Sequence, residues 1–113
     1  EIVKLEQAIK GADLVITGEG RVDAQSIFGK VLYGIGKKAQ RYNIPVIAIV
    51  GDIGEGFSPI YKYGINSIMS TVKKAISIDE AMKMSKILLK DATERMMRII
   101  KTGMEIAKKD YFK

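Results

Sequence analysis

Two short apolar runs, each followed at once by a glycine-rich charged segment, constrain the fold of this chain most strongly. Residues 14–17 (LVIT) and 46–50 (VIAIV) are continuous and unalternated, which is typical of strands buried on both faces of a parallel sheet. The first leads into residues 17–30 and the second into residues 51–56. Parallel strands end at a common edge, where open α/β folds bind ligands. The pattern therefore predicts an α/β fold with two functional loops at one sheet edge.

Helical periodicity accounts for most of the remaining chain. Apolar residues recur every three or four positions in residues 1–12 and from 29 or 30 to 42, residues 57–63 suit one or two helical turns, and residues 65–69 a weaker third strand. Ser77 and Glu80 form a capping box that predicts a long amphipathic helix from 77 towards 109. Its inner, core-forming face is predicted to carry Ala81, Met84, Leu88, Ala92, Met96, Ile99 and Gly103, flanked by Leu89, Ile100, Met104 and Ala107. The length suits a single α/β segment, residues 1–113.

Composition removes several classes of chemistry. The chain has no His and no Cys, which excludes Ser-His-Asp and Cys-His catalysis and His- or Cys-ligated metals within it. No signal-peptide pattern and no apolar run of about 18 residues is present, so a soluble, cytoplasmic protein is expected, without a membrane partner. The net charge of +6 lies mainly after residue 71. Acidic residues interrupt this basic segment, which argues against a nucleic-acid partner.

The segment 17–30 (TGEGRVDAQSIFGK) is the best candidate for a functional site. Gly18 and Gly20 allow positive φ or a close backbone approach to an anion. Glu19 and Asp23 offer carboxylates for a metal or a proton, and Arg21 and Lys30 offer cations for phosphate oxygens. These side chains are what phosphate or Mg²⁺ chemistry needs.

Two nucleotide-binding motifs are matched only in part. A Walker A loop requires glycine where Ala24 stands and Ser or Thr where Val31 stands. Gly34-x-Gly36-x-x-Ala39 has dinucleotide-fingerprint spacing, but it lies inside the predicted helix and does not directly follow a strand. Close packing of this helix on the sheet is the preferred interpretation of these glycines.

The longest motif resembles a known family. Residues 13–30 (DLVITGEGRVDAQSIFGK) are similar to the DLVITGEGR(I/V)D-x-Q-(T/S)-x-x-GK segment of type I bacterial glycerate kinases. Residues 45–51, 54–70 and 77–81 resemble that family's PVIAIAG strand, GxGYxALYxxGIDAVFS region and SLEEA helix start. The chain departs from the family at Ala24, at Phe28 and in residues 71–74, where the family often has a PG loop.

The resemblance implies a Rossmann-like three-layer α/β fold and a fragment from the C-terminal part of a larger two-domain kinase, inactive when isolated. It implies phosphorylation of D-glycerate, usually to 2-phosphoglycerate, with ATP as cosubstrate, Mg²⁺ as cofactor and the remainder of the kinase chain as partner. The catalytic candidates are Glu19, Arg21, Asp23 and Lys30, with Asp23 or Glu19 on Mg²⁺. The substrate- or phosphate-binding candidates are Gly18, Gly20, Gln25, Ser26, Gly29, Gly51 and Asp52.

Two other functions remain open at this stage. The same two loops would serve a non-catalytic module that binds a nucleotide or phosphometabolite. The long basic helix would serve an interaction protein, which its mixed charges and apolar stripe disfavour. Homo-oligomerisation, the hydroxyl that is phosphorylated and the division of roles between Glu19 and Asp23 are left open by the sequence.

Overall fold

The computed structural model describes residues 2–26, 29–72 and 74–109, with the side chains of residues 2, 3 and 30 outside the description. It divides into two compact units, residues 1–70 and 71–113. Along the chain the elements are α1 (Ile2–Lys10), β1 (Val15–Val22), α2 (Lys30–Arg41), β2 (Val46–Ile53), the 3₁₀ helix η2 (Ser58–Tyr63), β3 (Ser67–Ser70), α3 (Ile78–Lys83) and α4 (Ser85–Ala107).

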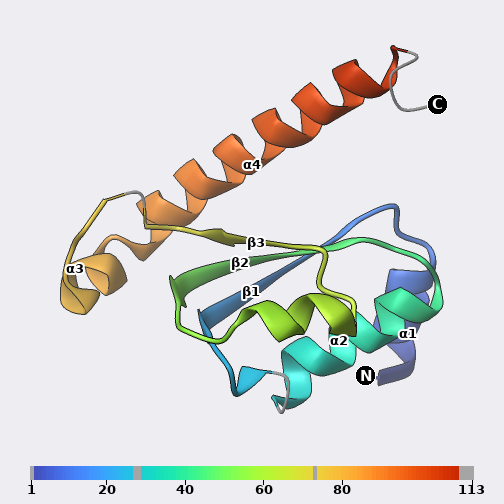
Figure 1. Ribbon diagram of the computed structural model, residues 1–113, viewed down its shortest axis with the longest axis horizontal. Coiled ribbons are helices and arrows are strands. Elements are labelled where there is room, and N and C mark those ends of the chain that lie inside the picture. Colours follow the sequence, from blue (N-terminus) through green and yellow to red (C-terminus); the bar gives the residue numbers. More distant parts are fainter. Residues whose placement is uncertain (1, 27–28, 73, 110–113) are drawn as a thin grey trace. The chain divides into compact units, whose positions relative to one another are not determined.

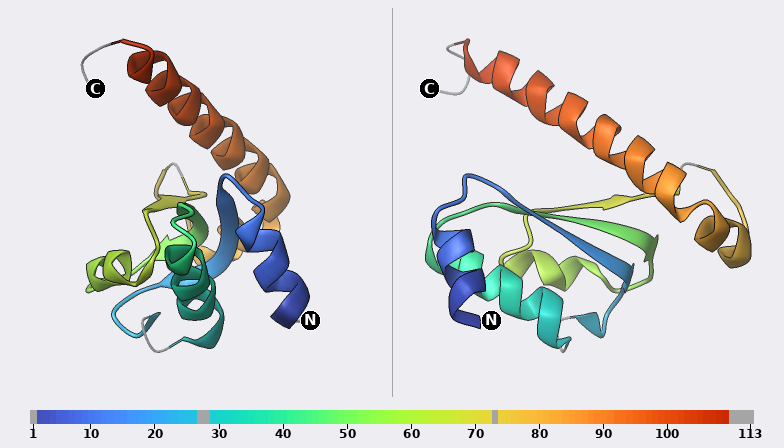
Figure 2. Two further views of the ribbon diagram at one scale, coloured as in Figure 1. Left: turned by 90° about the vertical axis from the view of Figure 1, so that its right-hand side faces the viewer. Right: turned by 180° about the vertical axis from the view of Figure 1, so that it is seen from behind.

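A parallel sheet in the order β1-β2-β3 organises the first unit. The helices α1, α2 and η2 lie on one face of this sheet (Figures 1 and 2). Between them and the sheet lies a core of buried aliphatic side chains: Ile9, Val22, Leu32, Ala39, Ile44, Val46, Ala48, Val50, Ile60 and Ile65. The predicted α/β fold with parallel strands and a long final helix is confirmed.

Burial differs between the two apolar runs that define the sheet. Val46, Ala48, Ile49 and Val50 of the central strand β2 are buried, as expected. Ile16 of β1 is 46% exposed, so the expectation that this strand is buried on both faces is wrong. The reason is topological, because β1 lies at the edge of the sheet.

Both strands extend into the segments that the sequence assigns to loops. β1 continues from the predicted end at Thr17 to Val22, and β2 continues from Val50 to Ile53. Register pairs join Glu19 to Val50, Arg21 to Asp52, and Val22 to Ile53. Glycine has a low intrinsic strand propensity, but here the pairing of two adjacent parallel strands overrides it. Strand therefore covers six of the fourteen residues of the first predicted loop and three of the six residues of the second.

Glycines hold α2 against η2. A Cβ on Gly36 would collide with the Tyr63 carbonyl oxygen and lie 3.1 Å from Cδ1 of Ile65, whereas a Cβ on Gly34 would meet nothing within 4 Å. Gly64 ends η2 in the left-handed region at φ 92°, and its own Cβ position is occupied by the backbone of Gly36. The close-packing interpretation holds for Gly36, but the contact is with η2 and not with the sheet.

The second unit contains two helices where one was predicted. The N-cap half of the predicted capping box is present, since the Ser77 hydroxyl accepts a hydrogen bond from the Glu80 N–H at 3.1 Å. Met84, at φ −99° and ψ 13°, interrupts the helix although no proline or glycine stands there. Gly103 lies within α4 and does not end it.

Only part of the predicted inner face of the last helix is buried. Leu88, Ala92 and Met96, spaced four residues apart, are buried as expected. The prediction that this face stays buried further along the helix is wrong, because Ile99 is 63% and Met104 is 61% exposed. Apolar periodicity identifies the face of a helix that can be covered, and does not say how far along the helix the cover extends. No helix among the described residues is long and apolar enough to cross a membrane.

The two glycines of α2 provide a matched test of the packing. Gly36→Ala should lower the free energy of unfolding by about 1–3 kcal/mol, because the methyl group meets rigid backbone. Gly34→Ala should raise it by roughly 0.5–1 kcal/mol, because the site is open and alanine is the better helix former. Urea denaturation of both variants measures the difference. Equal effects would contradict the glycine contact between α2 and η2.

Candidate functional site

The parallel register places charged residues of two strands side by side. Arg21 near the end of β1 is the register partner of Asp52 near the end of β2. The pairing continues beyond the strands, since the Gly54 N–H donates to the Val22 carbonyl at 2.7 Å and the Ala24 N–H to the Glu55 carbonyl at 3.2 Å. The predicted meeting of two glycine-rich segments at one sheet edge is confirmed.

The Arg21 guanidinium is held between two carboxylates. Its Nε donates to Oδ2 of Asp23 at 3.0 Å, and its Nη1 donates to Oδ2 of Asp52. The hydrogen bond to Asp23, together with the charge of Asp52, raises the pKa of Arg21 above its usual value. The guanidinium is therefore a permanent cation whose charge is compensated by neighbours before any ligand arrives.

A tight turn fixes Asp23 after β1. Its Oδ1 accepts the Gln25 N–H at 2.9 Å, and its own N–H donates to the Ser26 hydroxyl at 2.9 Å. Such a reciprocal arrangement is the usual use of Asp and Ser in turns. The Gln25 N–H and then the Arg21 guanidinium lower the pKa of Asp23, because both stabilise its ionised form. Asp23 is therefore a fixed anion with both oxygens engaged.

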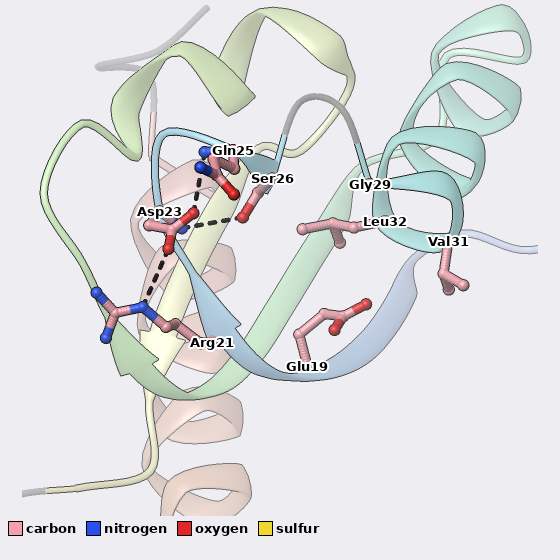
Figure 3. A pocket seen from close by; sticks show the side chains of 8 residues that line it. All are labelled: Glu19, Arg21, Asp23, Gln25, Ser26, Gly29, Val31 and Leu32. Atoms are coloured by element: carbon pink, nitrogen blue, oxygen red, sulfur yellow. Dashed lines mark hydrogen bonds and ion pairs between the residues drawn. The ribbon is translucent and has the colours of Figure 1, made fainter.

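A cavity of about 290 Å³ opens beside this turn. Figure 3 shows the side chains that line it, with Glu19 pointing from β1 toward Leu32 at the start of α2. Its lining residues are Glu19, Arg21, Asp23, Gln25, Ser26, Gly29, Val31 and Leu32. Six of the candidate site residues predicted from the sequence therefore line one cavity. Glu19 forms no hydrogen bond or ion pair with another described residue, so its carboxylate is available to a ligand.

The remaining candidates fall outside this cavity. Asp52 takes part through its ion pair with Arg21 and does not line the cavity. A Cβ on Gly51 would lie 2.9 Å from the Gly20 carbonyl oxygen, so Gly51 serves the close approach of the strands. Gly18 and Gly20 do not have positive φ, because they lie in β1. Lys30 begins α2, and its side chain lies outside the described residues.

Sequence reasoning missed Gly54 and Gly56 as residues that shape the site. A Cβ on Gly54 would lie 2.9 Å from Cβ of Asp23, and one on Gly56 would lie 2.8 Å from Cβ of Ala24. Gly56 also has a φ of 72°. Their place in the second glycine-rich segment was the available signal, but only the structure shows that both pack against the turn after β1.

Carboxylates dominate the charge at this edge, with three of them (Glu19, Asp23 and Asp52) to one guanidinium. No group of three or more Asp or Glu side chains among the described residues is arranged to hold a metal ion. Mg²⁺ commonly takes only one or two carboxylates, together with water and substrate phosphates. The uncommitted carboxylate of Glu19 fits this requirement, whereas Asp23 fits it less well because Arg21 and Gln25 occupy its oxygens.

The lowered pKa of Asp23 predicts a pH dependence of stability. Above pH of about 4, the usual Asp value, the ionised carboxylate stabilises the folded chain. As the pH falls through that value the unfolded state takes up the proton first, so this stabilisation is lost. The free energy of unfolding should thus fall more steeply between about pH 5 and pH 2 for the wild type than for Asp23→Asn.

Urea denaturation across this pH range measures the two slopes. Asp13→Asn is the control, since Asp13 is exposed and has no hydrogen-bond partner among the described side chains. It should retain the wild-type slope. An Asp23→Asn slope equal to that of the wild type would contradict the assigned hydrogen bonds.

Comparison with known proteins identifies the family of this chain. The sequence profile of the glycerate kinase family matches residues 1–101. A glycerate kinase of Halalkalibacterium halodurans is 40% identical over 96 residues, which cover 85% of this chain and 25% of that protein. A glycerate kinase of Bacillus subtilis is 37% identical over 108 residues, 96% of this chain and 27% of that protein.

A solved structure shows the same fold. The crystal structure of a protein assigned as glycerate kinase 2 from Salmonella typhimurium LT2 matches with a TM-score of 0.64 and 33% identity, covering 91% of this chain and 26% of that one. The chain spans about a quarter of the length of the relatives it matches. On the extent of the profile match and the identity to these relatives, this chain belongs to the glycerate kinase family.

Proposed function

We propose that this chain contributes part of the active site to an ATP-dependent D-glycerate kinase. The observation that carries the proposal is the cavity beside the turn after β1, because six nominated residues of the family motif line it. Its fixed charges and backbone suit a reaction that depends on positioning and electrostatics. The relatives named above are glycerate kinases, and the chain itself corresponds to a quarter of their length, so the remainder of a kinase polypeptide completes the site.

The two carboxylates nearest the cavity suit different roles. A general base works best with a pKa near the working pH, and the lowered pKa of Asp23 makes it a poor base. We assign Asp23 the role of orienting the Arg21 guanidinium and fixing the turn. Glu19 has no described partner and faces the cavity, so we assign it the substrate hydroxyl proton or the Mg²⁺ ion.

The cations are assigned to the anionic parts of the substrates. Arg21 lines the cavity and has one guanidinium nitrogen without a described partner, so it suits a phosphate or the glycerate carboxylate. Lys30 begins α2 directly after Gly29, which lines the cavity, and we assign it to the phosphates. Gln25 and Ser26, which line the cavity, are assigned polar contacts with the substrates.

Because carboxylates outnumber the guanidinium at this edge, an anionic substrate requires further positive charge. Mg²⁺ held by Glu19, together with Lys30, would provide it. When bound, Mg²⁺ neutralises charge on the transferring phosphates. A relative from Escherichia coli named glycerate 2-kinase is 40% identical over 81 residues, 72% of this chain and 21% of that protein, so we propose 2-phosphoglycerate as the product. We also propose a cytoplasmic location.

The activity is tested on two polypeptides side by side: a full-length glycerate kinase that carries this segment, and the 113-residue chain. ATP-dependent phosphorylation of D-glycerate is expected from the first and not from the second, because a quarter of the kinase holds only part of the site. Binding of ATP without turnover by the folded full-length polypeptide would favour a non-catalytic binding module. Turnover by the short chain would contradict the shared site.

Lys30→Ala tests the phosphate contact in the same full-length polypeptide. Loss of a cation that stabilises the transferring phosphoryl group should lower kcat by about 10²-fold or more. Lys37→Ala is the control, since Lys37 is an exposed lysine of the same helix. Steady-state kinetics of both variants give the comparison, and a near-normal kcat for Lys30→Ala would remove Lys30 from the catalytic residues.

A further inference from the structure

The ion pair between Arg21 and Asp52 joins two neighbouring strands. Asp23 reaches Arg21 from a turn two residues away, whereas Asp52 reaches it from the neighbouring strand. The two residues are register partners in a parallel ladder, so the backbone of each is fixed by the sheet. Asp52 therefore fixes Arg21 from a rigid support that lies outside the cavity lining.

Stability alone does not account for this pair. The side chains of Arg21 and Asp52 are 56% and 51% exposed, and ion pairs in such surroundings contribute little to the free energy of unfolding. The pair instead determines the orientation of the Arg21 guanidinium. With Nε on Asp23 and Nη1 on Asp52, the plane of the guanidinium is fixed on two of its three nitrogens.

Because Gly54 has no side chain, there is space for the third guanidinium nitrogen, Nη2 of Arg21. A Cβ at this position would collide with Nη2 of Arg21 and lie 3.0 Å from its Cζ. The φ of Gly54 is not positive, so its conformation does not demand glycine. Its position is also fixed, because its N–H donates to the Val22 carbonyl at 2.7 Å. The missing side chain is what allows Nη2 to lie there.

We propose that Asp52 and Gly54 are positioning residues that make Nη2 of Arg21 the nitrogen presented to an anionic oxygen of the substrates. This inference rests on the proposed kinase function. The oxygen belongs to a carboxylate or a phosphate, and both accept a charge-assisted hydrogen bond from a guanidinium. Asp52 acts on the substrate through Arg21 and touches neither substrate.

Kinetics of a full-length glycerate kinase that carries this segment test the proposal. Asp52→Asn should lower kcat/KM by about tenfold or more, since a small misplacement of a contacting group has a large effect on rate. A rise in KM for glycerate alone assigns Nη2 to the carboxylate, and a rise in KM for ATP or a fall in kcat assigns it to a phosphate. Asp52→Glu, which restores the charge, should recover part of the loss.

Two further variants separate positioning from a general effect of charge or folding. Glu55→Gln removes a carboxylate from the same loop, and the Glu55 side chain has no described partner, so its kcat/KM should stay within about twofold of the wild type. Gly54→Ala should give a defect of the same kind as Asp52→Asn, because the methyl group displaces Nη2. Equal kinetics for Asp52→Asn and Glu55→Gln would overturn the proposal.

Nuclear magnetic resonance of the same full-length polypeptide, labelled with ¹⁵N-arginine, tests the positioning without relying on turnover. In the wild type, rotation about the Nε–Cζ bond of Arg21 should be slow and its two Nη signals distinct. Asp52→Asn should merge them and Glu55→Gln should not. Unchanged signals in Asp52→Asn overturn the positioning role, whereas absent glycerate kinase activity in the wild type overturns only the proposed function.

Discussion

The site depends on the parallel pairing of β1 with β2, which continues to the pair Val22 and Ile53. Without that extension, Arg21 and Asp52 would lie on separate loops. The ladder also continues into the turns through the hydrogen bonds from Gly54 to Val22 and from Ala24 to Glu55. These hydrogen bonds join the two segments beyond the ends of the strands. The side chains of the site are thereby supported by the sheet.

The glycines near this pairing do not act mainly as flexible loop residues, as their abundance would suggest. Gly18 and Gly20 extend as strand, and Gly51 lets the backbones of β1 and β2 approach. Only Gly56 and Gly64 have positive φ among the described glycines. A glycine-rich sequence is usually read as a flexible loop. Here Gly51 leaves out a side chain that would keep two backbones apart, and Gly54 one that would keep a backbone and a guanidinium apart.

Local patterns predicted the element types well and the site in part. Periodicity identified the helical segments because it reports one stretch of chain, although it joined α3 and α4 into one helix. Six residues of the motif do share a cavity. Strand ends were predicted too early because pairing with a neighbour is not a local property. The partnership of Arg21 with Asp52 depends on register between residues far apart in sequence, and no spacing rule contains it. The break at Met84 has no local signal either.

The net charge also gives a misleading view of the site. The chain carries a net charge of +6, yet around the cavity carboxylates outnumber the guanidinium. The charge of that guanidinium, on Arg21, is moreover already paired with Asp23 and Asp52. Charge that is compensated nearby cannot attract an anion over a distance, because opposite charges at close range cancel each other's field. Under the proposed function, Mg²⁺ and Lys30 would therefore attract an anionic substrate, and the fixed direction of the Arg21 donor would orient it. If the proposed function holds, the orientation of one guanidinium would matter more at this edge of the sheet than the number of basic residues.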